Sequence, residues 1–166
     1  GVYPRKSTCI YDRANSSMCS LTLDEIDPDV FNQAKIFHIS SITLALDPHL
    51  REVSLEVIKK FKETGTLISF DVNYRAALWS EEEAKPVIES IFPYVDLLFV
   101  SEETSRRMLR RTGTLEDIMR GYANDYGCKL VATTRREVVS PTRHNFNSKI
   151  LFEGEFYEEH PYKEIE

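Results

Sequence analysis

The stretch PHLREVSLEVIKKFKETGTLISFDV, residues 48–72, joins a helical pattern directly to a strand pattern. Its first part repeats apolar side chains near helical spacing, and Gly65 follows where a glycine ends many helices. Residues 66–72 are a short apolar run with strand-forming side chains, which is typical of a buried strand. A helix followed at once by a buried strand is the repeating unit of an α/β fold.

The same alternation continues along the chain on both sides of this stretch. We expect strands at residues 8–12, 35–39, 96–100 and 129–133, and helices near residues 27–34, 80–91, 102–111 and 114–126. Glu153-Gly154 between two short strand-like runs predicts a β-hairpin. The main strands are continuously apolar, so both faces of the sheet should be covered. The sequence therefore predicts a doubly wound, mostly parallel α/β sheet with helices on both faces and a C-terminal β-hairpin.

Composition narrows the class of ligand. The chain has 166 residues, 42% of them hydrophobic, which suits one domain with a core. A net charge of −6 argues against general binding to nucleic acid or to anionic membranes. The longest apolar runs are too short to span a bilayer, and residues 1–6 lack the apolar centre of a signal peptide. We therefore expect a cytoplasmic protein that binds small molecules and neither nucleic acid nor membranes.

Several common site motifs are missing from the sequence. Cys9, Cys19 and Cys128 have no CxxC spacing and no nearby histidine, so we interpret them as reduced thiols without a metal. The six glycines form neither GxGxxG nor the phosphate loop GxxxxGK[ST]. HExxH and GxSxG are absent as well. No metal site is predicted, and dinucleotide and P-loop binding are excluded.

Polar side chains gather where the predicted strands end. They are Ser40, Ser41, Thr43, Asp71, Asn73, Arg75, Ser101 and Glu102. Ligands of open α/β sheets bind beyond the carboxyl ends of the strands, so these groups should meet at one rim. Amides can bind sugar hydroxyls, and arginine can bind a carboxylate through two parallel hydrogen bonds. The alternative is that these residues only cap the helices that follow.

Three segments resemble the PfkB, or ribokinase-like, carbohydrate kinases. Residues 69–79, SFDVNYRAALW, are similar to the family's DxNxRxxLW signature. Residues 11–17, YDRANSS, resemble its YxRxxSA segment, and residues 37–43, FHISSIT, resemble FLHxSGIT. The matches follow the family's order and cover most of residues 1–135. The resemblance is strongest to 2-keto-3-deoxygluconate kinases and also extends to fructokinases.

The resemblance implies a sugar site. Its expected residues are Tyr3, Tyr11, Arg13, Ile42, Asn73 and Arg75. The first three would reach the sugar acid from the family's lid, and Ile42 would line the pocket. Arg75 would pair with the substrate carboxylate, because a keto acid needs a fixed cation that a neutral hexose does not. An ordinary solvated loop arginine is the alternative for Arg13.

The resemblance also implies a nucleotide site, with ATP and Mg²⁺ as cofactors. Ser101 and Thr133 occupy positions where the family contacts the nucleotide. The family usually has a glutamate three residues after the first of these, where this chain has Thr104. It also tends to have a glycine-containing loop after the fourth strand, whereas residues 133–137 contain no glycine. The placement of ATP is therefore not carried over from the family.

By the same resemblance, residues 1–20 would be the remnant of a lid, and residues 21–166 the central part of a kinase domain. The family's catalytic aspartate belongs to a Gly-Ala-Gly-Asp motif, which we expect beyond the C-terminus, so no catalytic residue is assigned. The complete protein would phosphorylate the terminal hydroxyl of 2-keto-3-deoxygluconate and could form a homo-oligomer through its lid. The chain alone is expected to be inactive. Two alternatives stay open: a kinase of fructose or another neutral sugar, and a short non-catalytic domain that binds a sugar acid.

Overall fold

The computed structural model describes residues 13, 15–140, 142–159 and 162–165. The strands are β1 Ile36–Ser40, β2 Leu67–Asp71, β3 Leu97–Phe99, β4 Leu130–Ser140, β5 Arg143–Phe152, β6 Glu155–Glu158 and β7 Tyr162–Ile165. The α-helices are α1 Val30–Gln33, α2 Ser41–Leu46, α3 Pro48–Glu63, α4 Glu81–Ile91, α5 Glu102–Arg107 and α6 Leu115–Tyr126. The short 3₁₀ helices are η1 Ser17–Ser20, η2 Leu23–Glu25 and η3 Phe92–Tyr94.

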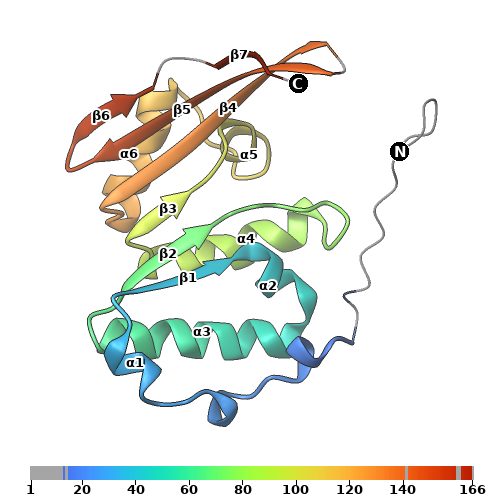
Figure 1. The fold of residues 1–166 in the computed structure, drawn as a ribbon, viewed down its shortest axis with the longest axis vertical. Coiled ribbons are helices and arrows are strands. Elements are labelled where there is room, and N and C mark those ends of the chain that lie inside the picture. The colour runs from blue at the N-terminus through green and yellow to red at the C-terminus, as the bar shows by residue number, and fades with distance from the viewer. Residues whose placement is uncertain (1–12, 14, 141, 160–161, 166) are drawn as a thin grey trace.

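These strands form one sheet in the order β1-β2-β3-β4-β5-β6, with β7 paired to β5 (Figure 1). Strands β1 to β4 run parallel, and β5 lies antiparallel to β4, β6 and β7. The predicted α/β class is confirmed, and so is the hairpin of β5 and β6. The predicted fourth strand is much longer than expected, because β4 continues into a second hairpin with β5.

One face of the sheet is a continuous apolar row. Neighbouring strands place Ile39, Phe70, Leu98, Val131 and Leu151 side by side, and all five are buried. Helices α3, α4 and α6 and η3 contribute buried side chains to the same core. The core therefore lies between this face and the helices.

The opposite face of the sheet is less covered. Phe99 is 40% exposed, Ile150 is 37% exposed and Ile36 is 52% exposed. Side chains alternate between faces along a strand, so Phe99 lies opposite the buried Leu98. In the described part of the chain no second helical layer packs over this face, although helices had been expected on both faces.

Helix ends follow the expected local signals. Ser80 begins α4 with a capping box that includes Glu83, and Thr114 begins α6 in the same way with Asp117. Gly127 ends α6 at φ 75°, in the left-handed region that favours glycine. Residues 102–111 were expected to be one helix, but α5 is shorter and ends at Arg107.

Two parts of the sequence prediction lie wholly or largely outside the described residues. The strand expected at residues 8–12 lies outside them, as does most of the expected lid remnant over residues 1–20. The division of the chain into residues 1–20 and 21–166 therefore stays a prediction. Among the described helices, none has the length and apolar character needed to cross a membrane.

Candidate functional site

A cavity of about 570 Å³ opens where β2, β3 and β4 reach the rim of the sheet, and we call it the strand-end pocket. Its lining residues are Asp71, Asn73, Tyr74, Arg75, Phe99, Val100, Ser101, Thr104, Ala132, Thr133, Thr134, Ser148 and Ile150. Four predicted site residues meet here from three separate strands: Asn73, Arg75, Ser101 and Thr133. Their convergence follows from the parallel arrangement, which brings the carboxyl ends of the strands to one edge.

The chain turns sharply as it leaves β2. Asn73 has φ 21°, and its backbone N–H donates a hydrogen bond to Asp71 Oδ1 at 3.1 Å. From α2, the buried Ser41 hydroxyl donates to the Val72 carbonyl oxygen at 2.5 Å. Asparagine tolerates such a backbone conformation better than most residues. These contacts fix the direction in which residues 73–75 enter the strand-end pocket.

Arg75 is an exposed cation on the wall of this pocket. Within the described part of the chain, its guanidinium makes no hydrogen bond or ion pair. Other arginines are engaged: Arg107 contacts Glu81 Oε1 at 2.8 Å, and Arg111 contacts Asp125 Oδ2 at 2.7 Å. The charge of Arg75 is therefore available for a ligand, and its planar fork matches a carboxylate.

Ser101 and Thr133 line the same pocket. Ser101 Oγ accepts a hydrogen bond from Thr104 N at 3.1 Å and donates to Thr104 Oγ1 at 2.8 Å. Ser101 thus caps α5, as the alternative interpretation proposed, while it also lines the pocket. Thr133 is only 4% exposed, and its hydroxyl has no hydrogen-bond partner among the described residues. A buried hydroxyl without a partner is costly, so a ligand or water at this point would stabilise it.

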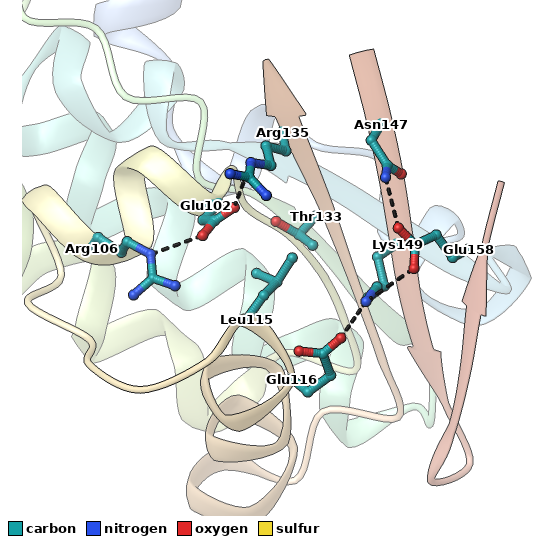
Figure 2. A pocket seen from close by; sticks show the side chains of 9 residues that line it. All are labelled: Glu102, Arg106, Leu115, Glu116, Thr133, Arg135, Asn147, Lys149 and Glu158. Atoms are coloured by element: carbon teal, nitrogen blue, oxygen red, sulfur yellow. Dashed lines mark hydrogen bonds and ion pairs between the residues drawn. The ribbon is translucent and has the colours of Figure 1, made fainter. Parts of the chain in front are cut away.

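A second cavity, of about 390 Å³, lies between α5, α6 and the β4–β5 hairpin, and Figure 2 shows it from close by. We call it the hairpin pocket. At one side, Glu102 Oε1 accepts a hydrogen bond from Arg106 Nε at 2.9 Å, and Arg135 Nε lies 3.6 Å from the other carboxylate oxygen. Arg135 thus lines the hairpin pocket, held by Glu102.

The other side of the hairpin pocket is a charged network around Lys149. Its ammonium group contacts Glu116 and lies 3.1 Å from Glu158 Oε2 (Figure 2). Asn147 Nδ2 also donates to Glu158, at 2.7 Å. The hydrogen bond to Glu116 raises the pKa of Lys149, and the same bond lowers the pKa of Glu116. The charges of this pocket are satisfied internally, so the strand-end pocket is the stronger candidate for a ligand.

The structure does not bring every predicted sugar-site residue to the strand-end pocket. Ile42 is half-buried on α2 and does not line the cavity. Arg13 is half-buried near η1, where its carbonyl oxygen accepts a contact from Cys19 Sγ at 3.9 Å. Tyr3 and Tyr11 lie outside the described residues. Their proposed contacts with substrate, like those of the other site residues, stay predictions.

Sequence reasoning also missed a residue. Tyr74 lines the strand-end pocket and donates its hydroxyl hydrogen to the Trp79 carbonyl oxygen at 3.1 Å. Its position between Asn73 and Arg75 was the available signal. Periodicity and strand-end rules give no reason to choose it, because its partner is a backbone atom.

The described residues contain no group of three or more His, Cys, Asp or Glu side chains arranged to hold a metal. Glu102 is the carboxylate that follows Ser101, and it is already contacted by Arg106 and Arg135. Magnesium usually keeps several waters and binds through substrate phosphates with one or two carboxylates. The residues described here therefore form no dedicated metal cage.

Comparison with known proteins identifies the family. Residues 3–135 match the model of the pfkB family carbohydrate kinases, and the chain belongs to this family. The expected resemblance is thereby confirmed. It agrees with the geometry, since the signature residues Asn73 and Arg75 line the strand-end pocket.

Individual relatives act on related sugars, as their names state. The chain is 37% identical over 144 residues to the 2-dehydro-3-deoxygalactonokinase of Haloferax volcanii, covering 87% of this chain and 45% of that protein. It is 39% identical over 94 residues to fructokinase-1 of Zea mays, covering 56% of this chain and 29% of that protein. The structure of 2-dehydro-3-deoxygluconokinase from Thermotoga maritima matches with a TM-score of 0.87 and 30% identity, covering 98% of this chain and 52% of that one. The chain thus spans about half the length of the first two ketodeoxy-sugar kinases it matches.

Proposed function

We propose that the complete protein is an ATP-dependent kinase of a 2-keto-3-deoxy sugar acid, either the gluconate or its galactonate counterpart. The observation that carries the proposal is Arg75, an exposed arginine on the wall of the strand-end pocket whose charge no described residue engages. A carboxylated substrate supplies the partner that this guanidinium lacks. The names of the Haloferax volcanii and Thermotoga maritima relatives support the same class of substrate.

The proposal divides the strand-end pocket into two halves. Asn73 and Arg75 would bind the hydroxyl and carboxylate groups of the sugar acid. Ser101 and Thr133 would face the phosphates of ATP, and Thr133 also lines the hairpin pocket, where Arg135 would contribute positive charge. Magnesium bound to the nucleotide would neutralise charge on the transferred phosphoryl group.

The acceptor hydroxyl must lose a proton during transfer, and a positioned carboxylate commonly takes it. The resemblance places this role on the aspartate of a Gly-Ala-Gly-Asp motif, which does not occur among these 166 residues. The proposal therefore concerns the complete protein. A cytoplasmic location and pairing of two copies through the lid are part of the same proposal.

A neutral ketohexose such as fructose is the second candidate substrate. The similarity to the Zea mays fructokinase favours it, because that match covers 94 residues. A fructose molecule has no carboxylate and would leave Arg75 without its partner. The two candidates therefore differ in what Arg75 contributes to binding.

The test is a substrate comparison with the purified complete protein. ATP-dependent product formation is measured for 2-keto-3-deoxygluconate, 2-keto-3-deoxygalactonate and fructose, each below its KM, so that kcat/KM values are compared. A charge-assisted pair with Arg75 predicts at least about a tenfold preference for one of the acids. A preference for fructose, or no phosphorylation of any of the three, would contradict the proposal.

A further inference from the structure

The loop over residues 72–80, between β2 and α4, carries both Asn73 and Arg75. A single side-chain contact closes this loop on itself: the Tyr74 hydroxyl donates to the Trp79 carbonyl oxygen at 3.1 Å. Tyr74 also lines the strand-end pocket. Tyr74 directly precedes Arg75 in the chain, so the position of the Tyr74 backbone determines where the Arg75 side chain leaves the loop.

Both ends of the loop are anchored in the body of the protein. Trp79 is buried, and the Arg51 guanidinium lies 5.4 Å from the centre of its ring. Arg51 is itself fixed, because its Nε donates to the Leu44 carbonyl oxygen at 3.1 Å. At the other end, Ser41 holds the Val72 carbonyl oxygen. Between these anchors, the hydrogen bond donated by the Tyr74 hydroxyl is the side-chain contact that spans the loop.

The phenol of Tyr74 is suited to this role. Tyr74 is half-buried, and burial together with the nearby charge of Glu81 raises the pKa of its hydroxyl. The group therefore remains a neutral hydrogen-bond donor at physiological pH. A Tyr hydroxyl that is withdrawn from water usually has a partner, and here the partner is a main-chain atom.

The position of the Arg75 side chain depends on how this loop is held. The Arg75 carbonyl oxygen accepts a hydrogen bond from the Leu78 N–H at 2.9 Å, and the Tyr74 hydroxyl adds the side-chain contact that spans the loop. No described residue engages the Arg75 guanidinium, so only the loop backbone limits where the side chain reaches. Two parallel hydrogen bonds to a carboxylate need the guanidinium in one plane and at one distance. Small displacements of positioning groups are known to cost large factors in activity.

We infer that Tyr74 is a positioning residue that sets the preference for carboxylated sugars, by holding the loop so that Arg75 meets the substrate carboxylate. The inference rests on the proposed function and deepens it. Removing the hydroxyl loosens the loop, weakens binding of the acid and leaves the nucleotide half of the pocket unchanged. A neutral sugar makes no demand on Arg75, and Asn73, which would bind its hydroxyls, is held by Asp71 and by the Ser41 contact to Val72 and not by Tyr74, so its binding is also unchanged.

The experiment compares Tyr74→Phe with wild type in the complete kinase. KM is measured for the sugar acid, for a neutral sugar and for MgATP. The expected result is an increase of about fivefold in KM for the acid, equal to the loss of one hydrogen bond, with the other two KM values unchanged. KM does not depend on the fraction of active enzyme, so partial unfolding does not imitate this pattern.

Two further variants sharpen the test. Tyr94→Phe is the matched control, because Tyr94 is also half-buried and its hydroxyl has no hydrogen bond to the described residues, so all three KM values should stay at wild-type levels. Tyr74→Phe in an Arg75→Ala background should cause no further increase, since both changes remove the same contact.

The inference and the proposed function fail in different ways. A wild-type enzyme that prefers the acid, combined with a Tyr74→Phe variant whose acid KM is unchanged or whose three KM values all rise together, overturns the role of Tyr74 alone. An additive effect of Tyr74→Phe and Arg75→Ala overturns it too. A wild-type enzyme that does not phosphorylate a sugar acid overturns the proposed function and the role of Tyr74 with it.

Discussion

Replacing Asp96 with asparagine tests how the parallel sheet is joined to its helices. Asp96 precedes β3, and its carboxylate is 8% exposed. Oδ2 accepts hydrogen bonds from Lys62 Nζ on α3 at 2.8 Å and from the backbone N–H of Ile68 on β2 at 2.9 Å. Lys129 Nζ lies 3.6 Å from Oδ1 at the start of β4. One carboxylate therefore links three elements.

The expected cost follows from these contacts. Asn keeps an oxygen for the Ile68 N–H and loses the charge-assisted bond to Lys62, which is worth about 1.5 to 3 kcal/mol. Lys62 is 36% exposed, so water replaces part of this energy and the lower half of that range applies. We expect Asp96→Asn to cost about 2 kcal/mol. Asp96→Ala should cost about 3 kcal/mol, because it also leaves the buried Ile68 N–H without a partner.

The dependence on pH has a defined sign. Burial opposes ionisation of Asp96, but the hydrogen bonds from Lys62 and Ile68 outweigh burial and hold the pKa of the carboxyl below its ordinary value. A lowered folded-state pKa contributes stability above the unfolded pKa of about 3.9, and this contribution is lost as pH falls through the folded value. The difference in the free energy of unfolding between wild type and Asp96→Asn should therefore have its full value at pH 7 and become smaller below about pH 4.

The assay is urea unfolding of the chain at several pH values. With a slope of about 2 kcal/mol per M, Asp96→Asn should lower the midpoint by about 1 M at pH 7. Glu63→Gln is the control, because Glu63 is exposed on the same end of α3 and makes no ion pair with the described residues. Equal midpoints at pH 7, or a difference that grows in acid, would refute the reasoning.

Two other predictions concern the core. Phe92→Ala should lower the free energy of unfolding in urea by about 3 to 5 kcal/mol, because this buried ring contacts Phe70 and Tyr122. Phe152→Ala, at a partly exposed ring, should lower it much less. Equal losses for the two variants would contradict this prediction. Burial raises the pKa of the Cys128 thiol to about 12, so alkylation at pH 8 should label Cys128 only after unfolding. Labelling is read by peptide mass. Rapid labelling of the folded chain would contradict the prediction, because it would show the thiol to be accessible.

Much of the fold could be predicted because local signals agree with the tertiary contacts. Gly65, at φ 80°, separates α3 from β2 as the sequence indicated. Ser80 and Thr114 both form the capping boxes that their following acidic residues suggested. Where the chain alternates a helix with a buried strand, hydrophobic periodicity decides the structure.

The long β4–β5 hairpin could not be predicted in the same way. Residues 134–149 are mostly polar and show no clear apolar alternation, so period-based reasoning ends β4 near Thr133. The register from Thr134 with Ser148 to Val138 with His144 is set by strand pairing, which is a long-range property. The short helix α2 was missed as well, although Ser40 caps it through Ile42 N.

The candidate site, like the fold, could be predicted only where it follows from the order of the strands. The strand-end rule brought Asn73, Arg75 and Ser101 together, because it follows from topology, whereas Thr133 was expected from the family resemblance. The closure of the loop by Tyr74 depends on a contact between a side chain and a main-chain oxygen five residues along the chain. No pattern in a single sequence indicates such a contact.

The measurement that tests the central claim most directly is the ratio of kcat/KM for the sugar acid to that for a neutral sugar, in the complete kinase and its Arg75→Ala variant. Loss of a charge-assisted pair at an exposed arginine predicts that the ratio falls at least about tenfold. The Arg75→Lys variant should have a ratio between those of the wild type and Arg75→Ala, since lysine keeps the charge and loses the planar fork. Lys59→Ala, at an exposed lysine on α3, should leave the ratio unchanged. A ratio that Arg75→Ala does not alter would contradict the assignment of the strand-end pocket to a carboxylated sugar.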